Sequence, residues 1–254
     1  MNMGLFSKKK GSTPFDNSAR QGTLHKNMNF TATEQYKLLR TNLRFTIPQG
    51  IKCPVVGVTS SMRGEGKSTT AVNLSYVLAE SGNKVLLVDG DLRIPSIAKK
   101  LGVNNAQGLT DLLLNKDVDM EAFKSELLDT WYILPSGAIP PNPSELLGSE
   151  RMAVLLEHLR EQFDYIVIDL PPVNLVSDAL SISNLITGLI LVIREEYAQK
   201  REVEECFRQL KLSNANLLGC VMNNTKTGGG AYGKYKKYGY YKHYYKYYKE
   251  NSND

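Results

Sequence analysis

A chain of 254 residues with 42% hydrophobic residues is long enough to bury a core, so one globular domain with tails is expected and a wholly disordered chain is excluded. The net charge of +5 is concentrated at the ends: residues 1–30 and 232–254 each total +4, which leaves −3 for the residues between them. A slightly acidic body argues against a nucleic-acid-binding core, whereas the basic ends are suited to an acidic partner or a membrane surface.

The apolar runs and the cysteines indicate the cellular compartment of the protein. No apolar run approaches the ~20 residues that span a bilayer, and the first ten residues hold too few apolar side chains for a signal peptide. The cysteines, Cys53, Cys206 and Cys220, are widely spaced and lie in or beside apolar runs. This spacing predicts small core residues in a reducing compartment, not a disulfide or metal framework. We therefore expect a cytoplasmic protein unless a partner recruits it to the membrane.

The apolar pattern predicts the elements in chain order. Residues 1–30 are polar and without a sustained period, which predicts disorder, and a helical stripe at residues 34–45 is ended by Pro48. Strands are predicted at residues 55–60, 84–89, 131–134, 165–169, 189–194 and 217–223. Helices are predicted at residues 67–81, 108–114, 120–128, 149–162, 177–186 and 201–212, with a proline-rich loop at residues 139–143.

Nearly continuous apolar strands, each followed by a helix, are typical of a parallel sheet that is covered on both faces. The sequence therefore predicts a three-layer α/β domain with a mainly parallel sheet at residues 31–227. Residues 228–254 follow it as a flexible tail.

A phosphate-binding loop is predicted between the first of these strands and the next helix. The segment SMRGEGKS, residues 61–68, matches the GxxxxGK[ST] pattern of P-loop NTPases, with Ser61 in place of the first glycine. Gly64 and Gly66 would let the backbone turn its amides toward phosphate oxygens. Lys67 would reach the β- and γ-phosphates, and the Ser68 hydroxyl would ligate Mg²⁺. The predicted ATP-binding residues of this loop are Met62, Arg63, Gly64, Glu65, Gly66, Lys67, Ser68 and Thr69.

Three aspartates follow or end predicted strands, where open parallel sheets bind their ligands. Asp89 and Asp91 lie in VLLVDGDLR, and Asp169 ends YIVID in the manner of a Walker B carboxylate that holds a metal ion. Together with Lys67, Mg²⁺ and Arg93 as a possible further cation, they are the parts that phosphoryl transfer needs. Either Asp91 or Asp89 could accept a hydroxyl proton, and the sequence does not separate them.

The C-terminal segment has an unusual composition. It follows the glycine run at residues 228–230 and contains no Leu, Ile, Val or Phe against which rings could pack. Taken alone, it is open to three interpretations: a phospho-acceptor segment, a basic-aromatic strip for single-stranded nucleic acid, or a low-complexity tail with neither role. The predicted phosphorylation sites are its tyrosines, Tyr232, Tyr235, Tyr238, Tyr240, Tyr241, Tyr244, Tyr245, Tyr247 and Tyr248.

With these motifs, the chain from about residue 34 to its end resembles the bacterial tyrosine kinases (BY-kinases) of capsule and exopolysaccharide assembly. The resemblance rests on the Walker A loop SSMRGEGKST, the second aspartate motif LLVDGDLR, the Walker B motif IVIDLPP and the tyrosine cluster. It extends to the stretches EQYKLLRTNLRF, GLTDLL and IPPNPSELL. The family is unrelated in fold to eukaryotic protein kinases and derives from the P-loop proteins that include the Min/Par ATPases.

The resemblance implies an enzyme that transfers phosphate from ATP to protein tyrosine. It implies that Lys67, Ser68, Asp89, Asp91 and Asp169 serve Mg-ATP and catalysis, with Ser68, Asp89 and Asp169 at the metal. It also implies that Asn223, at the end of the last strand, lies where this superfamily often reads the adenine base. Autophosphorylation of the tail between subunits and control of polysaccharide synthesis and export are implied as well.

The resemblance further implies partners. Glu34, Lys37 and Arg40 match the family's ExxRxxR subunit-contact motif in a predicted oligomerisation helix at residues 34–47, so the unphosphorylated chain is expected to form a ring. Lys37 replaces an arginine of that motif and loses its fork geometry, and Arg63 stands where relatives usually have proline. The absence of an apolar span fits the family's split form, which implies a separate membrane adaptor that docks on and activates the kinase. A cognate tyrosine phosphatase is also expected, and no nucleic-acid partner.

Two other functions compete with a kinase. A Min/Par-type ATPase switch usually has a signature lysine early in the loop, where this chain has Met62, and often a C-terminal amphipathic helix, whereas residues 232–254 have no aliphatic face. A non-enzymatic module that reads nucleotide state is the second alternative. The presence of all three aspartates argues against it.

Overall fold

The computed structural model describes residues 30–114 and 119–225. The predictions for the N-terminal segment, the glycine run and the tyrosine cluster lie outside the described residues. The described part forms a sheet of six parallel strands in the order β3-β2-β4-β1-β5-β6. The strands are β1 (Val55–Ser60), β2 (Val85–Asp89), β3 (Trp131–Leu134), β4 (Tyr165–Asp169), β5 (Gly188–Arg194) and β6 (Leu217–Asn223).

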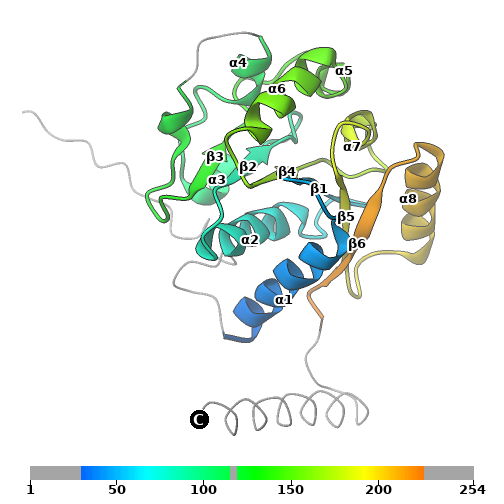
Figure 1. Ribbon diagram of the computed structural model, residues 1–254. Coiled ribbons are helices and arrows are strands. Elements are labelled where there is room, and N and C mark those ends of the chain that lie inside the picture. Colours follow the sequence, from blue (N-terminus) through cyan, green and yellow to red (C-terminus); the bar gives the residue numbers. More distant parts are fainter. Residues whose placement is uncertain (1–29, 115–118, 226–254) are drawn as a thin grey trace, which may run out of the picture.

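The helices cover both faces of this sheet (Figure 1). One face packs against α1 and α2, through Leu43 of α1 and Leu74, Val77 and Leu78 of α2. The other face packs against α6, α7 and α8. The helices are α1 (Phe30–Thr46), α2 (Lys67–Glu80), α3 (Ile97–Leu101), α4 (Leu109–Leu113), α5 (Pro143–Leu147), α6 (Glu150–Arg160), α7 (Asp178–Ile182) and α8 (Lys200–Leu212), with a 3-10 turn η2 (Met120–Phe123).

The central strands explain why the sequence shows apolar runs and not alternation. Residues of β1, β2 and β3 are buried throughout, because successive side chains enter opposite cores and both cores are covered by helices. The predicted three-layer α/β fold with a parallel sheet is confirmed. The parallel direction also brings the carboxyl ends of all six strands to one edge, where the loop after β1 and the aspartates after β2 and β4 meet.

Several predicted helices differ from the structure. The helix expected at residues 120–128 is only the turn η2, because Lys124 is extended and forms an antiparallel bridge with Tyr132 of β3. The proline-rich loop expected at residues 139–143 leads into α5, which begins at Pro143; proline is favoured in the first helical turn because its missing N–H has no partner there. Helix α3 was not predicted, and α7 is shorter than the expected helix at residues 177–186.

The prediction of three core cysteines is correct for two. Cys53 and Cys206 are buried, whereas Cys220 is exposed. Cys220 lies on β6, an edge strand whose residues are only partly covered, in contrast to the buried central strands. The error follows from the strand order, because the last strand of the chain is also the last of the sheet.

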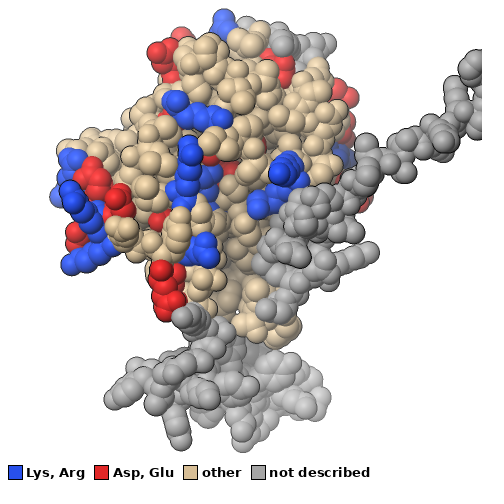
Figure 2. Space-filling view, turned by 180° about the vertical axis from the view of Figure 1, so that it is seen from behind, with Lys and Arg blue, Asp and Glu red and all other residues tan. Residues whose placement is uncertain are grey.

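Figure 2 shows the charged side chains of the described domain on the face seen from behind. Basic side chains gather over its middle, and α8 at its edge presents acidic and basic side chains together (Figure 2). On α8, Arg208 pairs with Glu205 and Lys200 with Glu204. Of the helices that the structure describes, none is long and apolar enough to cross a membrane.

Candidate active site at the carboxyl edge of the sheet

The predicted phosphate loop joins the end of β1 to the start of α2. Gly64 and Gly66 have φ angles of 83° and 99°, in the left-handed region that glycine adopts without steric cost. The reason for glycine at position 66 is also steric, since a Cβ there would lie 2.0 Å from Nδ2 of Asn223. The two glycines therefore give the loop the curl that the sequence predicted.

A buried carboxylate stabilises the start of the loop. The Ser61 amide donates to Oε2 of Glu65 at 3.2 Å, and the Ser61 hydroxyl donates to Oε1 at 2.6 Å. Burial raises the pKa of Glu65, although the bonds from Ser61 partly oppose that shift. These contacts explain why serine can replace the first glycine of the pattern: its hydroxyl and amide both bind the Glu65 side chain. The sequence indicated Glu65 only as a loop residue and missed this role.

Strand register brings the predicted aspartates together. Asp89 and Asp169 are paired residues on the neighbouring strands β2 and β4. The Lys67 ammonium lies 2.9 Å from Oδ2 of Asp91 and 3.5 Å from Oδ1 of Asp169, and 3.3 Å from the Ser68 hydroxyl. Burial lowers the pKa of Lys67, but the charges of Asp169 and Asp91 outweigh it and the net shift is upward. A fully charged lysine therefore lies among the aspartates.

Asp89 and Asp91, two residues apart, have different hydrogen-bond partners. Strand β2 ends at Asp89. Asp89 accepts bonds from the amides of Ser96 and Ile97 at 3.0 and 2.9 Å, so it stabilises the start of α3. Asp91 instead accepts from the Ile94 amide at 3.1 Å and from Lys67.

Two carboxylate oxygens at this edge are buried without a hydrogen-bond partner: Oδ1 of Asp89 and Oδ2 of Asp169. Burial and the nearby Asp169 raise the pKa of Asp89 to about 7, and burial raises the pKa of Asp169 as well. A buried, unpaired carboxylate oxygen is costly unless a cation or donor meets it. This donor set is chemically suited to a divalent cation.

Magnesium fits these residues. Mg²⁺ usually keeps several waters and takes one or two carboxylates together with phosphate oxygens, so it does not require a complete protein cage. Within residues 30–114 and 119–225, no group of three or more His, Cys, Asp or Glu could hold a metal by itself. The predicted ligands Ser68, Asp89 and Asp169 would hold the ion, and it would supply positive charge next to the phosphates.

Replacing Asp89 by asparagine is expected to stabilise the metal-free protein at alkaline pH. An acid whose pKa is raised by folding contributes full stability below its unfolded pKa of about 4, and that contribution is lost as the pH rises through about 7. Asparagine keeps an oxygen for the amides of Ser96 and Ile97 but cannot ionise. Thermal unfolding in EDTA should show the variant more stable by roughly 1–3 kcal/mol at pH 8.

The difference between the Asp89→Asn variant and the wild type should shrink at pH 5, where both side chains are neutral. Added Mg²⁺ and nucleotide should stabilise the wild type much more than the variant. A variant that is less stable than the wild type at pH 8 in EDTA would contradict the conclusion that the buried Asp89, whose Oδ1 lacks a partner, is unfavourable when charged.

Arg93, in the segment after β2, binds residues in the first turns of α5 and α7. Its Nε donates to both oxygens of Asp178, at 3.0 and 3.2 Å, and a terminal nitrogen donates to the Ser144 hydroxyl at 3.0 Å. The Ser144 hydroxyl donates in turn to Asp178 at 2.6 Å. The guanidinium that the sequence indicated as a possible further cation is bound to the buried carboxylate of Asp178. The sequence missed Asp178 and Ser144, since only the fold brings the first turns of α5 and α7 to Arg93.

Asn223 lies beside the phosphate loop, at the end of β6. Its Nδ2 donates to the Glu65 carbonyl at 2.8 Å, and its Oδ1 accepts from the Asn224 amide at 2.9 Å. Arg194, at the end of β5, donates to the Gly64 carbonyl at 3.1 Å. The sequence indicated Asn223 as a base-reading residue and did not indicate Arg194.

The predicted subunit-contact face of α1 makes contacts within one chain. Lys37 pairs with Glu34 at 3.0 Å, with both side chains 40% exposed. Arg40 donates to the Val77 carbonyl of α2 at 2.6 Å. Glu34 and Lys37 thus remain accessible, whereas Arg40 also fastens α1 to α2.

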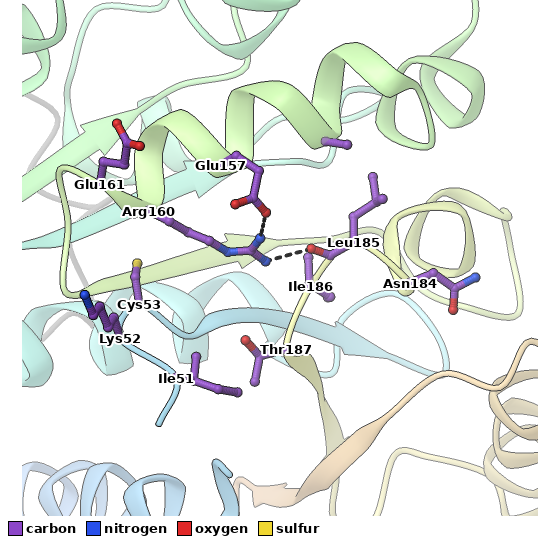
Figure 3. A pocket seen from close by; sticks show the side chains of 11 residues that line it. Ile51, Lys52, Cys53, Glu157, Arg160, Glu161, Asn184, Leu185, Ile186 and Thr187 are labelled. Carbon is purple, nitrogen blue, oxygen red and sulfur yellow. Dashed lines mark hydrogen bonds and ion pairs between the residues drawn. The ribbon is translucent and has the colours of Figure 1, made fainter. Parts of the chain in front are cut away.

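A separate cavity of about 900 Å³ lies at the amino ends of the strands, beside the residues that precede β1 and β5 and the end of α6 (Figure 3). Arg160 extends along it, pairs with Glu157 and donates to the Leu185 carbonyl at 2.9 Å. The cavity is lined by acidic, basic and aliphatic side chains. Because the phosphate loop and the aspartates lie at the other ends of the strands, this cavity is not part of the candidate active site.

A parallel sheet with a phosphate loop, a loop lysine and metal-binding aspartates at one edge defines a P-loop nucleotide-binding protein. A family model described as an AAA domain matches residues 54–218. The curated relatives include the tyrosine-protein kinase YwqD of Bacillus subtilis, 38% identical over 76% of this chain and 81% of the relative. They also include the tyrosine-protein kinase CpsD of Streptococcus pneumoniae serotype 4, 36% identical over 80% and 88%. The chain belongs to the bacterial tyrosine-kinase family.

Solved structures agree with this family. The chimerical protein CapA2B2 has a TM-score of 0.74 and 34% identity, covering 82% of this chain and 90% of that one. The septum site-determining protein MinD of Pyrococcus horikoshii, complexed with Mg-ADP, is more distant: its TM-score is 0.56 and its identity 28%, over 69% and 72%. The resemblance to bacterial tyrosine kinases and the P-loop fold are both confirmed.

Proposed function

We propose that this chain uses Mg-ATP to phosphorylate the tyrosine cluster of a second copy of itself, and that this activity regulates capsular or exopolysaccharide synthesis and export. The observation that supports it best is the convergence of Lys67, Asp91 and Asp169 beside a curled phosphate loop. The tyrosines that follow residue 231 in the same chain supply an acceptor. Relatives named as tyrosine-protein kinases support the reaction class.

Each residue has a distinct part in the proposed reaction. ATP supplies the phosphoryl group: a tyrosine oxygen forms a new bond to the γ-phosphorus, the bond to the ADP oxygen breaks, and the tyrosine proton is released. Loop amides and Lys67 would bind the phosphates, and Ser68, Asp89 and Asp169 would hold Mg²⁺. For the base we favour Asp91 over Asp89, because Asp89 is a proposed metal ligand. Arg93 would add positive charge at the rim while bound to Asp178.

Mapping of phosphotyrosine tests the proposal. After incubation with Mg-ATP, phosphate is expected on the tyrosines between Tyr232 and Tyr248 and not on serine or threonine. A Min/Par-type ATPase switch is the alternative, supported by the structural likeness to MinD. Release of inorganic phosphate with no phosphotyrosine would contradict the kinase proposal and favour the switch.

Partners and location belong to the same proposal. We infer a membrane adaptor whose cytoplasmic segment docks on the kinase and activates it, a cognate tyrosine phosphatase, and a cytoplasmic protein recruited to the inner face of the membrane. Phosphorylation would change the tail of residues 232–254 from cationic to anionic, which supports a regulatory role. Each phosphate adds about −1.5 to −2 charge, so three or four would outweigh its six lysines.

Assembly is expected to depend on Glu34 and Arg40. A closed ring repeats the same contact at every interface, so even a modest ion pair acts many times. The Glu34→Ala/Arg40→Ala chain should be monomeric by light scattering, whereas the unphosphorylated wild type should be a large oligomer. Because Arg40 also binds the Val77 carbonyl, Glu34→Ala alone serves as the control that leaves the α1–α2 contact intact. A double variant with wild-type mass and wild-type tail phosphorylation would exclude α1 from the interface.

A further inference from the structure

Two carbonyl oxygens of the phosphate loop are bound by side chains from outside the loop. Arg194 donates to the Gly64 carbonyl at 3.1 Å, and Asn223 donates to the Glu65 carbonyl at 2.8 Å. These two side chains end the adjacent strands β5 and β6. Consecutive peptide groups at the centre of the loop are therefore both held from the β5–β6 side.

The orientation of a carbonyl determines the orientation of the next amide. In a planar trans peptide the C=O of one residue and the N–H of the next point to opposite sides. With the Gly64 and Glu65 carbonyls directed at Arg194 and Asn223, the amides of Glu65 and Gly66 face away from β5 and β6. Successive amides that face one side of a loop form an anion-binding concavity. The contacts thus favour a donor arrangement suited to phosphate before any nucleotide is bound.

Arg194 is itself held in place. The turn after β5 closes with amides of Tyr197 and Ala198 donating to the Arg194 carbonyl, at 3.3 and 3.0 Å. This turn brings the Tyr197 ring to 5.1 Å from the guanidinium carbon, a cation–π distance. The Tyr197 hydroxyl also lies close to Gly64: a Cβ at Gly64 would be only 3.0 Å from it. The Arg194–Tyr197 pair therefore lies beside Gly64 of the loop.

Asn223 is held as closely as Arg194. Its carbonyl accepts from the Glu195 amide at 3.0 Å, and its Oδ1 accepts from the Asn224 amide. Its side chain lies close to the loop, since a Cβ at position 66 would be 2.0 Å from its Nδ2. Both oxygens and the amide nitrogen of Asn223 are thus engaged with protein, and the nitrogen is directed at the loop backbone.

We propose that Arg194 and Asn223 are positioning residues, which hold the loop amides toward the nucleotide phosphates and so set phosphate affinity. The inference rests on the proposed nucleotide site, and it assigns to Asn223 a role toward the loop in addition to, or in place of, reading the base. The two roles differ in one measurable respect. A residue that orients the loop affects every nucleotide with the same phosphates, whereas a residue that reads the base affects adenine nucleotides selectively.

The experiment measures the dissociation constants of fluorescent ADP and GDP, with Mg²⁺, for full-length wild type and variants. Arg194→Ala and Asn223→Ala should each weaken ADP binding by about 5- to 50-fold, as expected for a lost hydrogen bond to a charged or tightly packed group. Each should weaken GDP binding by the same factor. Arg194→Gln, a neutral donor, should recover part of the loss. Arg208→Ala, on the exposed face of α8, is the matched control and should bind ADP like the wild type.

The outcomes separate the possibilities. Equal losses for ADP and GDP, with the double variant losing less than the product of the two single factors, support joint positioning of one loop. A loss confined to ADP in Asn223→Ala would overturn its positioning role in favour of base reading. Wild-type affinity in Arg194→Ala would overturn the role of Arg194. This experiment measures nucleotide binding and not turnover, so it can fail or succeed independently of the kinase proposal. If the variants lose affinity as expected but the protein forms no phosphotyrosine, the positioning inference stands and the proposed kinase reaction is rejected.

Discussion

The Lys67→Met chain is expected to lose phosphoryl transfer almost completely, with activity at least about 10²–10³-fold below the wild type. Lys67 is the cation nearest to both Asp91 and Asp169, and its side chain is only 12% exposed. Methionine has nearly the same length and fills the same space. It lacks the positive charge that would stabilise the negative charge of the γ-phosphate during transfer. The measurement is phosphotyrosine formed per unit time at saturating Mg-ATP.

Two controls distinguish the loss of the Lys67 charge from unfolding of the protein. Lys99→Met removes an exposed lysine from α3, beside the site, and should keep wild-type activity. Thermal unfolding should show that Lys67→Met still folds, although Asp91 and Asp169 lose their counter-ion and the change in stability depends on pH. Activity near the wild-type level in a folded Lys67→Met protein would contradict the assignment of the site.

The phosphate loop could be recognised from the sequence because its parts are local. A strand, a glycine-rich loop and a helix follow one another within residues 55–80, so the pattern itself gives the geometry. The pairing of Asp89 with Asp169 follows from two buried parallel strands that both end in aspartate. Parallel strands place their carboxyl ends at one edge whatever their order, which is why the convergence of the aspartates could be predicted without the strand order.

What the sequence did not show depends on contacts between distant segments. Asp178 and Ser144 look like ordinary polar residues until the fold places both beside Arg93. Helix α3 has little apolar periodicity of its own and begins where Asp89, eight residues before Ile97, accepts its first amides. The exposure of Cys220 depends on β6 being an edge strand, and edge position is a property of the strand order.

A second large effect, restored tyrosine phosphorylation, is expected when two chains that are each inactive alone are mixed. One is full-length Lys67→Met, which keeps the tyrosine cluster but lacks the catalytic cation. The other is residues 1–227, which keeps the catalytic site but lacks the cluster. If the active site of one copy modifies the tail of another, the mixture should phosphorylate tyrosine although neither chain does so alone. At roughly 3.3 Å per extended residue, the ~20 residues after the glycine run could span on the order of 60 Å, enough to reach a neighbouring subunit.

The intact mass of each chain in this mixture, before and after phosphatase treatment, is the most direct measurement of tail phosphorylation between subunits. After incubation with Mg-ATP, the full-length Lys67→Met chain should gain several multiples of one phosphate, which phosphatase removes. The chain of residues 1–227 should gain none on the cluster it lacks. An unchanged mass for the Lys67→Met chain, under conditions in which the wild type becomes phosphorylated, would contradict transfer from one subunit to the tail of the next.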